Sequence, residues 1–208
     1  MKIDEKVLEF LSSNEYALFE ADVLNEAGNI HASTNQMYDA EVGLPYRYHL
    51  DLAVNIARSN LVFIQGISPD LCRLLIFSTA FHDVLEDTRE TYNDLLRLSE
   101  SYLSDDWSRR QAVEAVYAVT NEKGRNRHER ANEAYYAGIR NTAFAPYIKV
   151  CDRVANMTFA FRKGGKHMRD AYLAELDNFI QSVIPEGCEW PYSVPEQLLK
   201  QLVSYGSR

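Results

Sequence analysis

Apolar residues recur at steps of three and four along most of the chain, which is the spacing of one face of an α-helix. The clearest helix starts at Ser68-Pro69-Asp70, where an N-cap residue, a proline at the first helical position and an early acid follow one another. The apolar pattern then continues to Leu85 and covers most of the circumference of this helix. We therefore expect a central, buried helix in this part of the chain.

The same periodicity predicts further helices at residues 3–12, 14–27, 46–64, 91–100, 106–120, 127–141, 143–162, 168–183 and 195–205. No alternating apolar and polar run is long enough to build a sheet, and the sequence has no internal repeat. Loops are expected at Gly164-Gly165 and between Pro185 and Pro195. The pattern as a whole predicts an all-α helical bundle.

Composition and charge exclude some classes of function. The 208 residues are 46% hydrophobic and 25% charged, as in one ordinary globular domain spanning 1–208. The net charge of -8 makes the surface acidic, so nucleic acid is a poor candidate partner. An anionic substrate must then be attracted by a local group of cations or by a metal ion.

No apolar run approaches the roughly 18 residues that a membrane-spanning helix requires, and the first residues lack the apolar centre of a signal peptide. The cysteines, Cys72, Cys151 and Cys188, are widely spaced and form no C-x-x-C pair. These features predict a cytoplasmic protein with free thiols and no membrane partner.

The segment FHDVLEDT, at residues 81–88, carries the strongest chemical signal. In a continuous helix His82 would lie four residues before Glu86, and Asp83 four before Asp87, so all four side chains could approach one side of a turn. Three carboxylates and an imidazole at the end of an apolar helix are costly to desolvate unless a cation compensates. The alternative is a solvated helix end, but acids there oppose the helix dipole. The segment therefore favours a divalent metal site.

Two other segments bear on this site. GLPYRYHL, at residues 43–50, places His49 at the beginning of a helix close to Tyr46, where a lone histidine is more often structural than a ligand. YIKVCDRVANM, at residues 147–157, sets polar side chains on adjacent turns of an otherwise apolar helix: Lys149, Asp152, Arg153 and Asn156. The alternative for this helix is a surface array of salt bridges, although the helix has little free polar face.

The order His, then His-Asp, then a distant Asp resembles the HD superfamily of metal-dependent phosphohydrolases. The fuller set G-x-P-Y-x-x-H, H-D-x-x-E-D-T and K-x-x-D-R-x-x-N-M resembles the (p)ppGpp hydrolase branch, which includes the hydrolase domain of the RelA/SpoT proteins and the small alarmone hydrolases. The match covers residues 28–180 and leaves a helical extension at 185–208. The resemblance implies an all-α HD-domain bundle that binds one Mn²⁺ ion.

Carried over by position, the resemblance implies four metal ligands: His49, His82, Asp83 and Asp152. Glu86 and Asp87 would orient or deprotonate the attacking water. Asn156 would contact the nucleotide or support the ligands, and Tyr46 would line the nucleotide pocket. Lys149 and Arg153 are further candidate substrate contacts.

A basic segment follows Val119-Thr120, where the family has a V-T-K stretch. Its cations suit contact with phosphates: Lys123, Arg125, Arg127 and Arg130. The alternative is a solvated charged loop.

The chain departs from the family before the P-Y motif. Alarmone hydrolases commonly carry Arg-Lys-Ser-Gly there, and Ala40 and Glu41 replace the two cations that engage the nucleotide. The leading prediction is a (p)ppGpp 3'-pyrophosphohydrolase-like enzyme. It would act alone or as the partner of an alarmone-making toxin, and the sequence is compatible with a homo-oligomer. An HD-type nucleotidase for a nucleoside monophosphate or an NADPH-like dinucleotide is the alternative, and a non-catalytic nucleotide sensor is a third hypothesis.

Overall fold

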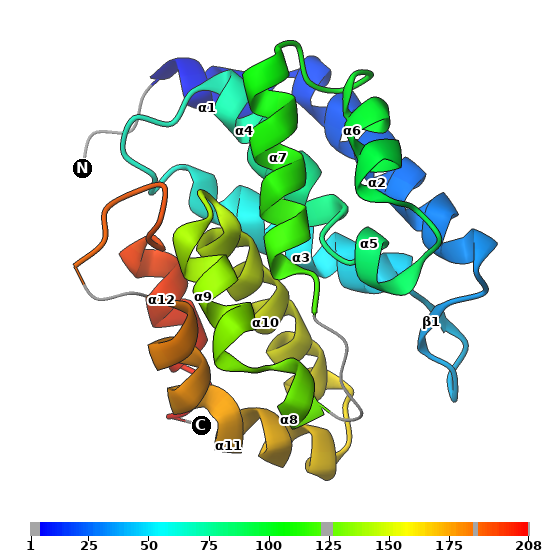
Figure 1. The fold of residues 1–208 in the computed structure, drawn as a ribbon, viewed down its shortest axis with the longest axis vertical. Coiled ribbons are helices and arrows are strands. Elements are labelled where there is room, and N and C mark those ends of the chain that lie inside the picture. Colours follow the sequence, from blue (N-terminus) through cyan, green and yellow to red (C-terminus); the bar gives the residue numbers. More distant parts are fainter. Residues whose placement is uncertain (1–4, 122–126, 185–186, 208) are drawn as a thin grey trace.

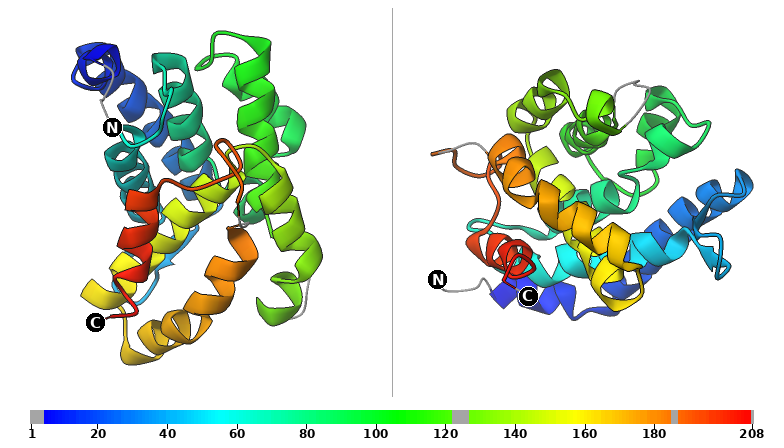
Figure 2. Two further views of the ribbon diagram at one scale, coloured as in Figure 1. Left: turned by 90° about the vertical axis from the view of Figure 1, so that its left-hand side faces the viewer. Right: turned by 90° about the horizontal axis from the view of Figure 1, so that it is seen from below.

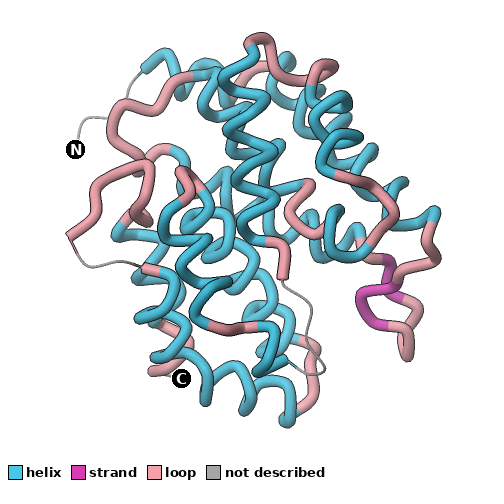
Figure 3. The backbone as a smooth tube through the Cα atoms, viewed as in Figure 1, coloured by secondary structure: helices cyan, strands magenta, loops and turns pink. Residues whose placement is uncertain are grey.

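The computed structural model describes residues 5–121, 127–184 and 187–207, without the side chains of residues 127 and 128. Helices account for most of this part of the chain (Figures 1 and 3). Their bounds are α1 (Glu5–Leu11), α2 (Asn14–Ser33), α3 (Arg47–Leu61), α4 (Pro69–Ala80), α5 (Val84–Asp87), α6 (Tyr92–Ser99), α7 (Asp106–Val119), α8 (Arg127–Arg130), α9 (Glu133–Asn141), α10 (Ala145–Arg162), α11 (Lys166–Val183) and α12 (Glu196–Val203). None of these helices combines the length and the apolar character that a membrane span needs.

Helices α3, α4, α7 and α10 form the centre of the bundle, in which α4 and α10 each pack on the other three. From Leu74 to Ala80, every residue of α4 is buried, which confirms the predicted central helix. Helix α10 contacts α3, α4, α7, α9, α11 and α12, and most of its side chains are buried. Asp152 and Arg153, in the middle of α10, are therefore buried.

The predicted helix beginning at Ser68 starts as expected but does not reach Leu85. The Ser68 side chain caps α4 by accepting a hydrogen bond from the amide of Leu71. Helix α4 ends at Ala80, a turn follows, and α5 begins at Val84. Within the turn, the His82 ring lies 2.7 Å from the carbonyl oxygen of Thr79. The prediction of one continuous helix was therefore wrong, and the break places His82 and Asp83 on a turn.

Other boundaries also differ from the prediction. Helix α2 continues to Ser33, beyond the predicted residue 27. The predicted helix 127–141 is two helices, because the Asn132 side chain caps a new helix by accepting from the amide of Tyr135. The predicted loop at Gly164-Gly165 is present between α10 and α11.

A short antiparallel hairpin, β1 (Met37–Asp39) and β2 (Leu44–Pro45), was not predicted. It projects from one side of the bundle in Figure 1, and again in the view from below in Figure 2. The hairpin joins α2 to α3, so it brings the end of α2 close to the first turn of α3.

Candidate metal centre and active site

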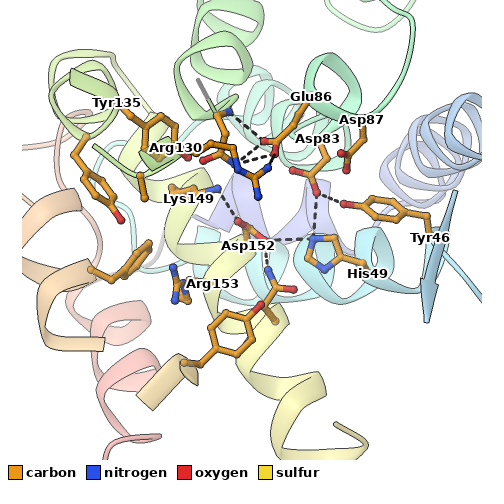
Figure 4. A pocket seen from close by; sticks show the side chains of 16 residues that line it. Tyr46, His49, Asp83, Glu86, Asp87, Arg130, Tyr135, Lys149, Asp152 and Arg153 are labelled. Atoms are coloured by element: carbon orange, nitrogen blue, oxygen red, sulfur yellow. Dashed lines mark hydrogen bonds and ion pairs between the residues drawn. The ribbon is translucent and has the colours of Figure 1, made fainter. Parts of the chain in front are cut away.

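Four of the sequence-predicted residues meet at the centre of the bundle. His49 lies on the first turn of α3, His82 and Asp83 on the turn between α4 and α5, and Asp152 in the middle of α10. Both histidines are 1% exposed, and Asp152 is 7% exposed. Figure 4 shows His49, Asp83 and Asp152 pointing toward one another from these separate elements. Packing of the central helices therefore gathers residues that are far apart in the chain.

The carboxylate oxygens of Asp83 and Asp152 both lie close to the imidazole nitrogens of His49 and His82. Nε2 of His49 lies 3.1 Å from Nε2 of His82 and 3.3 Å from Oδ1 of Asp152. Oδ2 of Asp83 lies 3.0 Å from Nε2 of His82 and 3.5 Å from Nε2 of His49. Nε2 of His82 also lies 3.6 Å from Oδ1 of Asp152.

Four of these five separations fit the geometry of a bound cation. Nitrogen and oxygen ligands held about 2.1 Å from a metal, at angles between octahedral and tetrahedral values, lie about 3.0–3.5 Å from one another. His49, His82 and Asp83 form a group able to hold a metal ion. The buried group is therefore consistent with a divalent metal site.

Hydrogen bonding orients one imidazole for this task. Nδ1 of His82 lies 2.7 Å from the carbonyl oxygen of Thr79 and can only donate to it. Nε2 then carries the lone pair that faces the cluster, which is the tautomer that metal-binding histidines adopt. Nδ1 of His49 is buried and has no hydrogen-bond partner among the described residues, while the His49 ring stacks on Tyr38 at 4.9 Å.

The charges in the cluster are strongly coupled. Burial lowers the pKa of His82, but the carboxylates of Asp83 and Asp152 outweigh it and raise the pKa to about 10. Burial raises the pKa of Asp83, but the His82 and His49 imidazoles hold it well below its usual range. Without a metal, imidazole protons compensate the carboxylates. A divalent cation can replace those protons.

Asp152 has further partners on its own helix. Its Oδ2 lies 3.0 Å from Nζ of Lys149, and its Oδ1 accepts a hydrogen bond of 2.5 Å from Nδ2 of Asn156. Tyr38 donates to Oδ1 of Asn156 at 2.8 Å. The side chain of Lys149 is only 11% exposed, so the surface salt-bridge alternative for this helix is wrong.

The two acids of α5 point in different directions (Figure 4). Both oxygens of Glu86 accept hydrogen bonds from Nδ2 of Asn121, at 2.9 and 2.7 Å, and Oε2 also accepts from the Asn121 amide at 3.1 Å. Oδ2 of Asp87 accepts from Nε2 of Gln36 at 2.7 Å. Although the continuous helix was wrong, Asp83, Glu86 and Asp87 still line one cavity.

This cavity has a volume of about 240 Å³ and contains most of the predicted substrate contacts. Tyr46, Lys149, Arg153 and Asn156 line it, and the Tyr46 hydroxyl donates a hydrogen bond to Oδ2 of Asp83. Arg153 also forms an ion pair of 3.1 Å with Glu175. The predicted contacts Lys123 and Arg125 lie outside the described residues, as does the side chain of Arg127.

Several residues at the site were missed by the sequence analysis. Asn121 lines the cavity beside Glu86, together with Arg130, whose Nη1 lies 3.7 Å from Oε1 of Glu86. The sequence analysis placed Arg130 among the basic residues but gave Asn121 no role. Tyr38, His31 and Gln36 contact site residues from behind the cavity wall. No chemical motif marks these positions, and only the folded chain brings them to the site.

Comparison with known proteins gives one informative result. No protein-family model matches the chain, and no curated protein matches its sequence. Among solved structures, the chain resembles one described as a metazoan orthologue of SpoT that hydrolyses ppGpp and plays a role in starvation responses. The TM-score is 0.57 at 18% identity, with 89% of this chain and 94% of that chain covered. At this identity the likeness concerns the fold alone, and it confirms the predicted all-α helical bundle.

Proposed function

We propose that this protein is a metal-dependent phosphohydrolase that removes pyrophosphate or phosphate from a phosphorylated nucleotide. The carrying observation is the close approach of the Asp83 and Asp152 carboxylates to the buried imidazoles of His49 and His82. An acid pair lies beside that point and lines the same cavity. This combination suits hydrolysis of a phosphate ester or anhydride.

These four side chains would hold the metal, and Mn²⁺ is the proposed ion because mixed imidazole and carboxylate ligation suits it. When bound, the cation supplies Lewis acidity that favours ionisation of water and offsets the charge of a phosphoryl group. Tyr46 and Lys149 would support the site through their contacts with Asp83 and Asp152. These contacts hold the two carboxylates in one orientation.

Asp87 is the proposed general base. Glu86 uses both of its oxygens to accept hydrogen bonds from Asn121. Asp87 accepts from Gln36 on Oδ2, and Oδ1 has no hydrogen-bond partner among the described residues. Oδ1 is therefore available to accept the proton of the attacking water. Glu86 would instead anchor the end of α7 through Asn121.

Substrate phosphates would be bound by cations around the cavity. Arg130 and Arg153 line it, and the neighbouring basic residues Lys123, Arg125 and Arg127 are proposed to add to them. Planar guanidinium groups suit bidentate contact with phosphate oxygens. The cations would also stabilise the negative charge that spreads over the phosphoryl oxygens during transfer.

(p)ppGpp is the leading substrate, because the fold is that of a protein described as hydrolysing ppGpp. The products would be pyrophosphate and GDP or GTP. One observation favours a second candidate: Ala40 and Glu41 follow β1 at the place where the family carries two cations. A nucleotidase for a nucleoside monophosphate or an NADPH-like dinucleotide is therefore the alternative.

A substrate screen tests this proposal. The purified chain is incubated with Mn²⁺ and ppGpp, pppGpp, NADPH or nucleoside monophosphates, and products are separated by chromatography. We expect hydrolysis that stops on EDTA addition and returns with Mn²⁺. Turnover that persists in EDTA, or no hydrolysis of any of these compounds, would contradict the proposal.

A further inference from the structure

A chain of partly buried polar contacts runs from the end of α2 to Asp87. His31 lies in the last turn of α2, and its Nδ1 is 2.5 Å from Oε1 of Gln36. Nε2 of Gln36 is in turn 2.7 Å from Oδ2 of Asp87. Neither His31 nor Gln36 belongs to the motifs that suggested the site, and the two residues reach α5 from a separate segment.

The direction of each hydrogen bond follows from the chemistry of the groups. An ionised carboxylate can only accept, so Gln36 must donate through its amide nitrogen. The Gln36 oxygen then accepts, which requires the hydrogen of His31 to lie on Nδ1. His31 is fully buried, and burial lowers its pKa, so the neutral ring with one hydrogen fits this arrangement.

His31 also supports a second side chain of the site. Its ring stacks on Tyr46, with centroids 4.3 Å apart and an interplanar angle of 20°. The Tyr46 hydroxyl donates to Asp83. Nε2 of His31 is buried without a hydrogen-bond partner among the described residues. An unsatisfied buried nitrogen is unfavourable for stability, so this histidine is better explained by its effect on the site.

We propose that Gln36 is a positioning residue that orients the Asp87 carboxylate, and that His31 fixes the Gln36 amide for this purpose. The inference rests on the proposed function, in which Asp87 accepts the proton of water. With Oδ2 held by Gln36, Oδ1 keeps one orientation. A base held in its reactive orientation avoids the entropic cost of finding it in each turnover.

The first test compares two variants. Gln36→Met keeps the length of the side chain but removes its amide, and Gln65→Met makes the same change at an exposed position in the loop after α3. We expect Gln36→Met to lower kcat by about 10- to 100-fold. KM and the Mn²⁺ concentration for half-activation should stay within about two-fold. Gln65→Met should match the wild type. An unchanged kcat in Gln36→Met would overturn the proposal.

A double-mutant cycle separates positioning from a general structural effect. In an Asp87→Ala background, Gln36→Met should cause no further loss of kcat, because the residue through which Gln36 acts is gone. An equal loss in both backgrounds would show that Gln36 does not act through Asp87.

His31→Phe keeps the stacked ring and removes the Nδ1 donor, so it should lower kcat without lowering the melting temperature. An unchanged kcat in His31→Phe would remove His31 from the proposal.

A crystal structure of Gln36→Met gives a readout that does not depend on activity. We expect the Asp87 carboxylate to leave its wild-type orientation or to occupy several. A wild-type orientation of Asp87 in this variant would overturn the positioning role. If the wild-type protein hydrolyses none of the tested nucleotides, the proposed function fails, and the crystal structure still decides whether Gln36 holds Asp87.

Discussion

At the scale of single residues, three of the four proposed metal ligands are held by a contact with a residue that is not itself a proposed ligand. Asp83 accepts a hydrogen bond from Tyr46, His82 contacts the Thr79 carbonyl, and Asp152 contacts Lys149. Contacts of this kind fix the orientation of a ligand before the metal arrives. The free energy of metal binding is then not reduced by the entropic cost of ordering these side chains.

Replacing Asp83 by Ala tests the metal centre directly. We expect loss of stoichiometric Mn²⁺ binding and loss of hydrolysis together, because Asp83 lies close to both imidazoles and its charge is the strongest influence that raises the pKa of His82. Calorimetric titration with Mn²⁺ and a product assay measure the two effects. Asp170→Ala, at an exposed position on α11, is the control. Full Mn²⁺ binding by Asp83→Ala would argue against this centre.

A pair of isosteric variants distinguishes the two acids of α5. Asp87→Asn should lower kcat by about 10²- to 10⁴-fold and leave Mn²⁺ binding intact, as expected for loss of a general base. Glu86→Gln should have a smaller effect on kcat, because Glu86 is engaged with Asn121. Steady-state kinetics at saturating Mn²⁺ decide the point. A larger loss of kcat in Glu86→Gln would assign the base to Glu86.

At the scale of elements, the sequence predicted most helices but not the break that shapes the site. Phe81 and Val84 are both buried, so the apolar periodicity continues across the turn between α4 and α5. What marks the break is a specific contact of His82 with Thr79, which a pattern of apolar positions cannot reveal. The break between α8 and α9 has a local signal in the Asn132 cap.

The same distinction applies to the site residues. The proposed ligands and the acid pair are recognisable because their chemistry is concentrated in short motifs. Gln36 and Asn121 are single polar residues in unremarkable surroundings, and each reaches α5 only through the fold. Contacts between distant segments depend on packing, which one sequence does not encode in its local pattern.

Lys149, the buried lysine of α10, gives a prediction at this scale. Lys149→Met leaves one oxygen of Asp152 without its ion-pair partner, which should destabilise the metal-free protein by on the order of 3 kcal/mol. With Mn²⁺ bound, the loss should be smaller, because the metal offsets the charge of Asp152. Urea unfolding with and without Mn²⁺ measures both values. Lys200→Met, in an exposed pair with Glu196, is the control. Equal losses in both conditions would contradict this expectation.

At the scale of the whole molecule, the proposed metal centre joins three parts of the chain: α3, the turn between α4 and α5, and α10. A cation bound to all three acts as a cross-link that exists only in the folded state. Metal binding should therefore raise the stability of the entire bundle.

This coupling should depend on pH. In the metal-free protein, protonated His82 stabilises the fold fully below the ordinary imidazole pKa near 6.5, and this contribution is lost as the pH rises toward its raised pKa of about 10. A cation requires neutral imidazoles, so its affinity rises with pH, by about tenfold per unit for each proton displaced. The increase in melting temperature on Mn²⁺ addition should therefore be larger near pH 8 than near pH 6. A pH-independent increase would contradict proton displacement.

The opposite directions of Glu86 and Asp87 have a mechanical consequence. Helix α5 has four residues. Glu86 accepts hydrogen bonds from Asn121, and Asp87 accepts one from Gln36. Asn121 directly precedes the basic segment at 122–127, which is proposed to bind phosphates. Helix α5 is thus held on two sides, by Asn121 beyond the end of α7 and by Gln36 directly before β1, so its position depends on both contacts.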